Sequence, residues 1–180
     1  VDGAGATQVR FGTVAAQNVV VLSDTSLTCV TPSGTGTVGV QLSNKNGSAS
    51  LAAAFRYVPA PALTTLFPAR GPEAGDTTLT LTGRGFTADQ AGANTVTIGG
   101  VPALDVLARS DDTLTCRTPS GVAGAARDVV LSNANGSATL TAAFTYFRLP
   151  TLTALTPARG PAEGGTSVTL SGSGFLADGA

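Results

Sequence analysis

The sequence predicts an all-β protein made of tandem β-sandwich modules, and three observations carry this prediction. Glycine accounts for 23 of the 180 residues and proline for 10, a composition typical of a chain with many tight turns. Apolar and polar residues alternate over short stretches, as they do in strands with one buried face and one solvated face. The pattern of the whole sequence also repeats with a period of about 88 residues.

The front half of the repeat is its clearest part. Residues 61–91 match residues 150–180 at an offset of 89, and 19 of the 31 positions are identical. The back half recurs too, since "LSDTSLTCVTPSG" at 22–34 matches "RSDDTLTCRTPSG" at 109–121 at an offset of 87. Identity this extended exceeds what shared composition produces, so the period marks a structural unit.

The period divides the chain into three segments. Residues 1–58 are expected to form the back part of one module, 61–147 a complete module, and 150–180 the front part of another. Asp2 and Asp178 occupy equivalent positions, so the sequence starts and stops in the same loop of the repeat. Two interpretations fit this pattern. The sequence is a window on a longer tandem array, or the front part of one subunit completes the back part of the next by strand addition.

Seven strands are expected in the complete module, and no segment of it shows a helical period. They are expected at 63–67, 77–83, 95–99, 103–108, 112–118, 127–133 and 137–146. Seven short strands in fewer than 100 residues are typical of an immunoglobulin-like sandwich. The predicted fold class is therefore all-β, with tandem immunoglobulin-like β-sandwich modules of about seven strands each.

Each strand follows from its own pattern. Pro68 ends the first strand, because proline has no N–H to give to a ladder. Strict alternation places Leu79 and Leu81 on one face of the second strand, and Leu114 and Cys116 on one face of the fifth. The third, fourth and sixth strands read "TVTIG", "ALDVLA" and "RDVVLSN". The last strand is expected to point four side chains inward, those of Leu140, Ala142, Phe144 and Tyr146.

An Asn-Gly pair lies between the last two strands as Asn135-Gly136, and it recurs as Asn46-Gly47. Asn-Gly favours a type I′ hairpin turn, because both residues tolerate positive φ. With the serine that follows, each pair is also an N-glycosylation sequon. The hairpin is the favoured interpretation of both pairs.

These motifs together resemble a known family. The stretches that carry the resemblance are "LTTLFPARGPEAGDTTLTLTGRGF", "VTIGGVPA", "DDTLTCRTPSG" and "DVVLSNANGSATLTAAFTY". They resemble the IPT/TIG family of immunoglobulin-like domains, which plexins, some transcription factors and bacterial surface proteins share. The residues expected to carry the motif are Pro68, Gly71, Pro72, Gly75, Gly83, Gly85, Phe86 and Cys116, with Pro157, Gly160, Pro161, Gly164, Gly172, Gly174, Phe175 and Cys29 in the other modules. The resemblance implies the fold, but this fold serves many functions.

The two cysteines, Cys29 and Cys116, occupy equivalent positions in different modules, which excludes a disulfide within one module. A cross-link between chains or a reactive thiol is one interpretation, and a buried small apolar side chain is the favoured one. The sequence has no histidine and no CxxC motif, so neither a zinc site nor a redox site is expected. No cofactor is predicted.

Several function classes lack the residues they need. Catalysis requires a nucleophile with a base, paired carboxylates or a metal, and none of these is apparent, so no enzyme is expected. Single aspartates in each loop, even beside the Asp111-Asp112 pair, fall short of a calcium site. A net charge of −1 with one lysine, Lys45, argues against nucleic-acid binding. No apolar run approaches the ~20 residues of a membrane span.

The segments are joined by short linkers, "YVPAP" and "YFRLP", whose prolines Pro59, Pro61 and Pro150 are expected to stiffen them. Together with the low charge and the repeat, this predicts a structural repeat unit of a bacterial extracellular fibre, stalk or adhesin shaft at the cell surface. Its expected partner is itself, as tandem neighbours or head to tail. The alternative is an accessory carbohydrate- or protein-binding module of an extracellular enzyme or receptor, with other surface proteins or glycans as partners. Aromatic residues at 5% and the absence of tryptophan weigh against a carbohydrate site.

Overall fold

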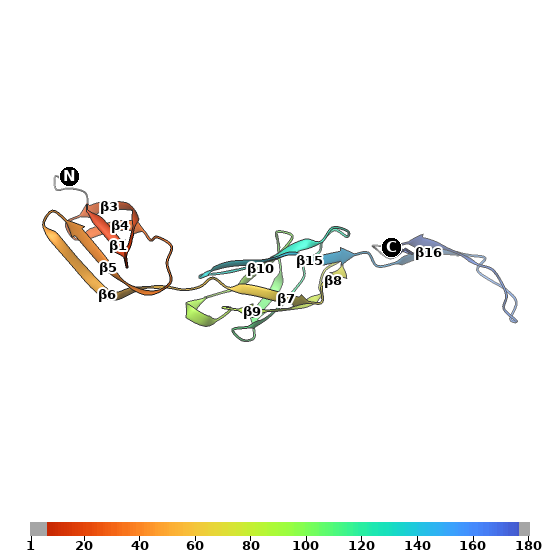
Figure 1. The fold of residues 1–180 in the computed structure, drawn as a ribbon. Helices are drawn as coiled ribbons and strands as arrows, with labels where there is room; N and C mark the ends of the chain where they lie inside the picture. Colours follow the sequence, from red (N-terminus) through yellow and green to blue (C-terminus); the bar gives the residue numbers. More distant parts are fainter. Residues whose placement is uncertain (1–6, 177–180) are drawn as a thin grey trace. The chain divides into compact units, whose positions relative to one another are not determined.

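The structure, a computed structural model, describes residues 7–176 of the chain (Figure 1). The chain separates into two compact units, Val1–Pro59 and Ala60–Ala180. Within the described residues the only helical element is the 3-10 turn η1 (Ala88–Gln90), and all other regular structure is strand. No helix in this range is both long and apolar enough to cross a bilayer. The all-β prediction is therefore confirmed.

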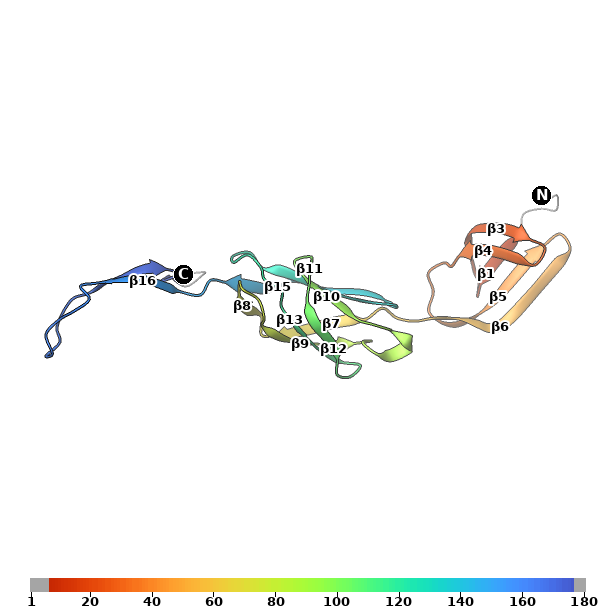
Figure 2. The same cartoon turned by 180° about the vertical axis from the view of Figure 1, so that it is seen from behind.

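The complete module contains nine strands in two sheets (Figure 2). They are β7 (Ala62–Phe67), β8 (Arg70–Pro72), β9 (Thr78–Arg84), β10 (Thr95–Ile98), β11 (Val101–Pro102), β12 (Leu104–Ala108), β13 (Thr113–Arg117), β14 (Arg127–Asn133) and β15 (Gly136–Phe147). One sheet has the order β11-β10-β14-β15-β8 and the other the order β12-β13-β9-β7. Seven of these strands lie where the sequence predicts them. The other two, β8 and β11, have only three and two residues.

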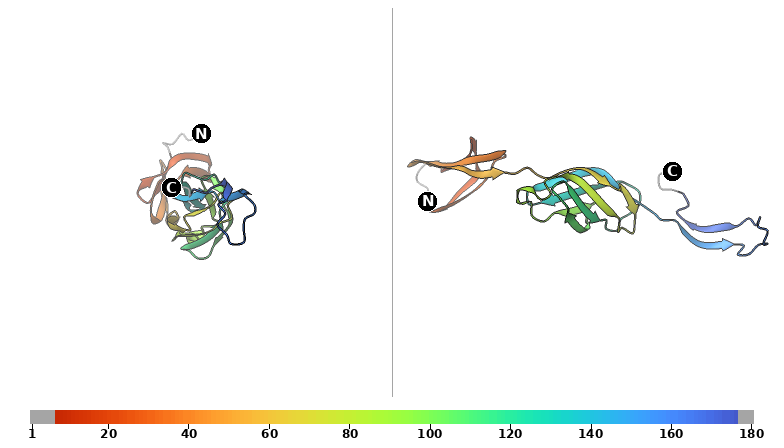
Figure 3. Two further views of the ribbon diagram at one scale, coloured as in Figure 1. Left: turned by 90° about the vertical axis from the view of Figure 1, so that its right-hand side faces the viewer. Right: turned by 90° about the horizontal axis from the view of Figure 1, so that it is seen from below.

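The core of the complete module lies between the two sheets (Figure 3). It consists of Leu79, Leu81, Leu114 and Cys116 from one sheet, Val96, Ile98, Val129, Leu131, Phe144 and Tyr146 from the other, and Phe86 from the loop after β9. None of these side chains is more than 2% exposed. Burial of a valine, leucine or phenylalanine side chain contributes about 1.5–3 kcal/mol, so this cluster supplies most of the drive to fold.

The first strand of the module is divided between the two sheets. The cis peptide bond between Phe67 and Pro68 separates β7 from β8. β7 pairs antiparallel with β9 in one sheet, whereas β8 runs parallel to β15 in the other, with Gly71 opposite Tyr146. The strands β7, β8 and β9, called the front strands below, therefore contribute to both sheets.

The last strand contains a bulge that sequence analysis did not predict. The pairing of β14 with β15 shifts here, so that three residues of β15 lie opposite Asp128 alone. Ala142 takes a φ of 49°, is exposed, and donates its N–H to Asp128 Oδ1 at 2.7 Å. The prediction that Ala142 points inward is wrong, because the bulge shifts the alternation and packs Ala143 against the core instead. Phe144 and Tyr146 are buried as expected.

The hairpin between β14 and β15 exists, but its turn is not the predicted type I′. The two loop residues are Ala134 and Asn135, and neither has a positive φ, whereas Gly136 begins β15 with a φ of 135°. Asn133 Oδ1 accepts the N–H of Asn135 at 3.0 Å, so a side chain closes the turn. The Asn135 amide group also donates to two carbonyls of η1 at 3.3 Å, which engages the side chain of the sequon.

Residues 7–57 form the back of another sandwich. Their strands are β1 (Gln8–Phe11), β2 (Val14–Ala15), β3 (Gln17–Ser23), β4 (Ser26–Val30), β5 (Gly36–Asn44) and β6 (Gly47–Tyr57). The sheet β2-β1-β5-β6 corresponds to β11-β10-β14-β15, and the pair β3-β4 corresponds to β12-β13. The bulge recurs at Ala53, with a φ of 48°. No counterpart of the front strands lies in the described part of this unit.

Residues 151–176 contain one antiparallel pair, β16 (Thr151–Thr156) and β17 (Thr169–Ser173). Its register repeats that of β7 and β9, including the same irregularity near the start of the first strand. Thr153 Oγ1 donates to the Ser171 carbonyl at 3.2 Å, as Thr64 Oγ1 does to the Thr82 carbonyl at 2.9 Å. The sequence of the front strands thus forms the same local structure without other strands beside it.

Replacing Leu114 by alanine is expected to lower the free energy of unfolding of the complete module by about 2–5 kcal/mol. The side chain is 0% exposed, so its truncation leaves a cavity between the two sheets. Hydrogen exchange of the β13 and β15 amides measures the loss. The matched control is Leu27→Ala at the equivalent position in residues 7–57, which should leave those amides unchanged. An equal loss in both variants would contradict the placement of Leu114 at the centre of this core.

Candidate interaction surfaces

The glycines of the motif allow the front strands to lie close together. A Cβ on Gly83 would overlap the carbonyl oxygen of Ala62 on the neighbouring strand, and a Cβ on Gly172 would overlap that of Thr151. Gly85 follows β9 with a φ of 78°, a conformation that residues with a Cβ rarely adopt, and Gly174 has a φ of 71°. The other motif residues lie in the connection between β7 and β9 or its counterpart: Pro68, Gly71, Pro72, Gly75, Pro157, Gly160, Pro161 and Gly164.

An apolar hollow lies open in residues 7–57. It is a cavity of about 350 Å³ formed by β1, β4, β5 and β6. Its lining includes Val9, Phe11, Leu27, Cys29, Val40 and Leu42. Leu114 and Val129, the counterparts of Leu27 and Val40, are 0% exposed in the complete module, whereas Leu27 and Val40 are only half-buried. The hollow therefore corresponds to the core face of a sandwich, and residues 7–57 alone do not cover it.

The pair β16–β17 has the complementary property. Val168 is 46% exposed, Leu170 49% and Phe175 55%. Their counterparts in the complete module, Leu79, Leu81 and Phe86, are all 0% exposed. The same three positions that fill the core of one sandwich thus present their apolar side chains to solvent in residues 151–176. Sequence analysis had treated Phe175 only as a motif residue.

The two cysteines are free thiols in different environments. Cys116 is 1% exposed, and burial raises the pKa of its thiol to about 11. Cys29 is half-buried and lines the apolar hollow. The difference arises because β9 covers Cys116, with Leu79 directly opposite, whereas no strand covers Cys29 within residues 7–57.

Asp111 holds the loop that follows β9. Its carboxylate accepts the backbone N–H groups of Gly85, Thr87 and Ala88 at 3.1, 2.9 and 2.7 Å. These hydrogen bonds lower the pKa of Asp111, because they favour the ionised form of the carboxyl group. The hydrogen bond from the Thr87 N–H has the largest effect. From its sequence context, Asp111 was considered as a calcium ligand and judged to fall short of one. The sequence does contain a signal for the observed role. The stretch "GRGF" follows a strand, so its backbone N–H groups are free to bind a carboxylate in a facing turn.

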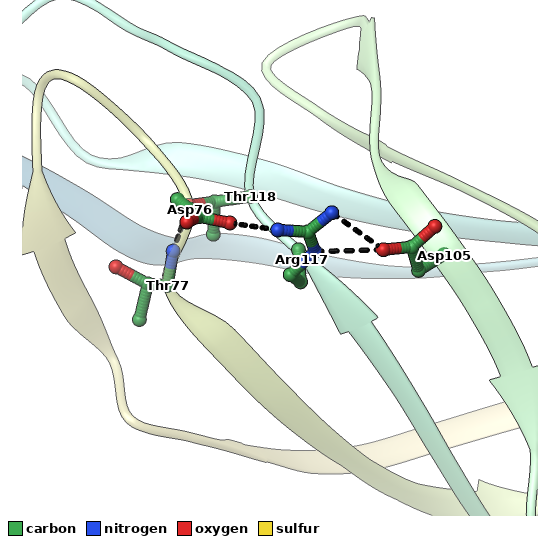
Figure 4. Close-up of polar contacts among 5 residues, drawn as sticks. All are labelled: Asp76, Thr77, Asp105, Arg117 and Thr118. Atoms are coloured by element: carbon green, nitrogen blue, oxygen red, sulfur yellow. Dashed lines mark hydrogen bonds and ion pairs between the residues drawn. The ribbon is translucent and has the colours of Figure 1, made fainter.

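A second polar cluster lies on the surface of the complete module (Figure 4). Arg117 Nε and Nη2 both donate to Asp105 Oδ2 at 2.7 Å, and Arg117 Nη1 pairs with Asp76. The carboxylates of Asp105 and Asp76 raise the pKa of Arg117, and Asp105 has the larger effect. Beside this group, Thr118 Oγ1 accepts the Thr77 N–H at 3.0 Å and ties the end of β13 to the start of β9.

This ion-pair cluster belongs to one module only. The positions equivalent to Asp105, Arg117 and Asp76 hold Asn18, Val30 and Gly165, which cannot form it. The three charged side chains are also exposed to solvent, where ion pairs contribute little to stability. The cluster is therefore a local surface feature rather than a site shared by the repeats.

Residues after β15 are held against the complete module. The Glu73 N–H donates to the Phe147 carbonyl at 2.8 Å, and the Arg70 guanidinium lies 4.7 Å above the Phe147 ring. Arg148 Nε contacts Glu73 Oε2 at 3.2 Å. Of the predicted linker residues, Pro61 is buried, and its Cα would lie 3.2 Å from a Cβ on Gly85. Pro59 and Pro150 are exposed.

The described residues bring no metal-ligand cluster together. No group of three or more His, Cys, Asp or Glu side chains that could hold a metal occurs within residues 7–176. Beside Asp111, the Asp112 carboxylate accepts the hydroxyl groups of Ser110 and Thr113. Both carboxylates are thus used in local structure.

Comparison with known proteins decides the family. The sequence profile of the IPT/TIG domain matches residues 2–57, 61–146 and 150–180. The chain belongs to the IPT/TIG domain family. The resemblance inferred from the motifs is confirmed, and so is the fold class of tandem immunoglobulin-like sandwich modules.

Two mammalian relatives share the IPT/TIG chain's sequence over most of its length. Fibrocystin-L of Mus musculus is 32% identical over 166 residues, and Fibrocystin-L of Homo sapiens is 33% identical over 129 residues. These matches cover 88% and 72% of this chain but only 4% and 3% of the relatives. Among solved structures, the extracellular region of plexin A4 aligns with a TM-score of 0.50 at 22% identity, over 83% of this chain and 13% of that one. That likeness shows the fold alone.

Replacing Asp111 by alanine is expected to lower the melting temperature of the complete module most at neutral pH. The folded state depresses the pKa of Asp111 below the unfolded value of about 4. The ionised carboxylate therefore stabilises the fold above pH 4, and this contribution is lost as the pH falls through the folded pKa. Melting curves of the wild type and Asp111→Ala should differ clearly at pH 7 and converge toward pH 2. A difference that grows on acidification would contradict the role of the carboxylate, and Asp24→Ala serves as the equivalent control in residues 7–57.

Proposed function

We propose that the chain is a non-catalytic structural repeat of a bacterial extracellular fibre, stalk or adhesin shaft, in which immunoglobulin-like modules follow one another in a linear array. The observation that carries this proposal is the spacing of the IPT/TIG matches. Residues 58–60 and 147–149 are all that separate the three matched segments. Linkers of three residues with prolines in or beside them leave few conformations for one module relative to the next.

Contacts at the end of the complete module support a stiff junction. Phe147 and Arg148 belong to the "YFRLP" linker, and both contact Glu73 of the preceding module. Arg70 stacks on the Phe147 ring, which combines a cation–π contact with apolar burial. The first two residues of this linker are thus bound to the complete module before the next segment begins.

An extracellular setting agrees with the known members of this fold. The plexin A4 segment that shares it belongs to an extracellular region. The surface of this chain has few charges, at 12% of residues, and its strands carry many threonines. A carbohydrate-binding role has weaker support, because sugar sites need several exposed rings together. Phe144 and Tyr146 are buried, Phe55 and Tyr57 are half-buried, and Phe67 is the one exposed ring in the described part of the complete module.

Small-angle X-ray scattering tests this proposal. Chains carrying one, two and four complete modules, made by repeating residues 61–149, should grow in maximum dimension by a constant length per module. A Gly-Ser spacer of four residues in each linker is the control, and it should reduce the growth toward the square-root dependence of a flexible chain. Square-root growth without the spacer, or specific binding of one complete module on a glycan array, would contradict the structural role.

A further inference from the structure

β12 is an edge strand of the complete module, because it ends the sheet β12-β13-β9-β7 and has no partner on its outer side in the described residues. Leu104 and Leu107 on this strand are 52% and 49% exposed, and Val101 on the adjoining β11 is 47% exposed. Unpaired backbone groups beside exposed apolar side chains form a surface on which another strand can add. The sequence of β12 indicates which strand that is.

The register with β13 shows which backbone groups of β12 point away from the sheet. The Arg109 N–H donates to a β13 carbonyl at 2.8 Å, and Leu107 lies opposite Thr115, two positions along both strands. Because hydrogen-bonded pairs recur every second residue in an antiparallel ladder, Leu107 also directs its N–H and C=O toward β13. The N–H and C=O groups of Val106 and Ala108, on either side of Leu107, therefore point outward.

Two opposite charges flank Leu107 on the outer face of the sheet. Asp105 contacts Arg117 through Oδ2 alone, and its other carboxylate oxygen points away from Arg117 (Figure 4). Arg109 Nε donates to Thr115 Oγ1 at 3.1 Å, which leaves the two Nη groups for another acceptor. The stretch "DVLAR" at 105–109 is therefore self-complementary in charge when two copies run in opposite directions.

We propose that β12 of the complete module pairs antiparallel with β12 of a second copy of the chain, about a two-fold axis at Leu107. In this register Val106 lies opposite Ala108 of the second copy, and their outward N–H and C=O groups form the hydrogen-bonded pairs. Leu107 packs against its own counterpart, and Asp105 lies opposite Arg109 on both sides of the axis. The contact goes beyond the proposed linear array, because it joins chains side by side and involves no linker residue.

Charge selects this register over its neighbours. A shift of one residue sets outward backbone groups of one copy opposite residues of the other whose groups point inward. A shift of two residues places Asp105 opposite Leu107 in one direction and opposite Asp111, a like charge, in the other. Opposite charges directly across an antiparallel pair are stabilising and like charges are destabilising. Of these registers, the proposed one alone forms two ion pairs.

The bulge at Asp105 makes the contact short and selective. Asp105 has a φ of 49°, and the pairing of β12 with β13 shifts between Leu104 and Leu107. Bulges and charges on an edge strand oppose pairing with most other strands. Here the charges match a strand of the same sequence, so the edge discriminates against other partners. The equivalent edge in residues 7–57 has Asn18 and Leu22 at the charged positions, so the contact is specific to the complete module.

A disulfide trap in the full chain tests the register. Every variant carries Cys29→Ala, because Cys29 is only half-buried, whereas Cys116 is buried and stays in place. With Leu107→Cys, the two new thiols lie at the two-fold axis in a non-hydrogen-bonded pair, whose Cα separation suits a disulfide. Oxidised glutathione should then produce a dimer on a non-reducing gel, at a rate that rises with protein concentration. The isologous contact closes on itself, so no larger species should follow.

Leu104→Cys is the matched control, because Leu104 is as exposed as Leu107 and lies on the same strand. In the proposed register, residue 104 lies roughly 20 Å along the strand from its counterpart in the second copy. Its dimer should therefore form at least about tenfold more slowly. Equal rates for the two variants, or a faster rate for Leu104→Cys, would overturn the proposal.

Charge reversal gives a second readout that unspecific cross-linking cannot imitate. Asp105→Arg sets arginines opposite each other, and Arg109→Asp sets aspartates opposite each other. Each change, combined with Leu107→Cys, should slow dimer formation at least about tenfold. An equimolar mixture of the two variants should restore the rate, because every charge then meets its opposite, and mass spectrometry should identify the product as the mixed dimer. A mixture that reacts no faster than the separate variants would refute the contact.

Discussion

The structure depends on one strand, β9, being enclosed on both edges and on its inner face. It pairs with β7 on one side and β13 on the other, and its inward residues Leu79 and Leu81 are fully buried. In residues 7–57, where no such strand is present in the described part of the unit, the equivalent core face is an open cavity of about 350 Å³. The front strands therefore supply Leu79 and Leu81, half of the four fully buried side chains that their sheet contributes to the core.

Polar contacts fix where β9 sits along β13. Just before β9, the Thr77 N–H donates to Thr118 Oγ1, and the Thr118 N–H donates to the Thr77 carbonyl. Just after β9, the Gly85 N–H donates to the Asp111 carboxylate. A slip of one residue would turn the buried leucines outward and break both contacts. Apolar burial thus drives closure, while a few hydrogen bonds at the two ends of β9 determine the register that the repeats share.

Sequence patterns predicted the buried strand faces, which depend on neighbouring residues. They did not predict the bulge and the loop contacts, which depend on residues far apart in the sequence. Alternation placed Leu79 and Leu81 in the core correctly, because each strand is half-buried and the side-chain period is two. Nothing in "TAAFTY" marks a residue with positive φ, so the bulge at Ala142 could not be found without its partner Asp128 on β14. The role of Asp111 was missed for the same reason, since its amide partners lie more than 20 residues away.

The two cysteines offer the most direct test, because in a polypeptide of residues 1–180 the same position is covered in one segment and uncovered in the other. Labelling with a maleimide in dilute solution at pH 8, read by mass spectrometry of the peptides, compares their rates. Cys29 should react readily, whereas Cys116, with a pKa raised to about 11 by burial, should react about two orders of magnitude more slowly until the module unfolds. Equal rates would contradict the claim that the front strands close the core.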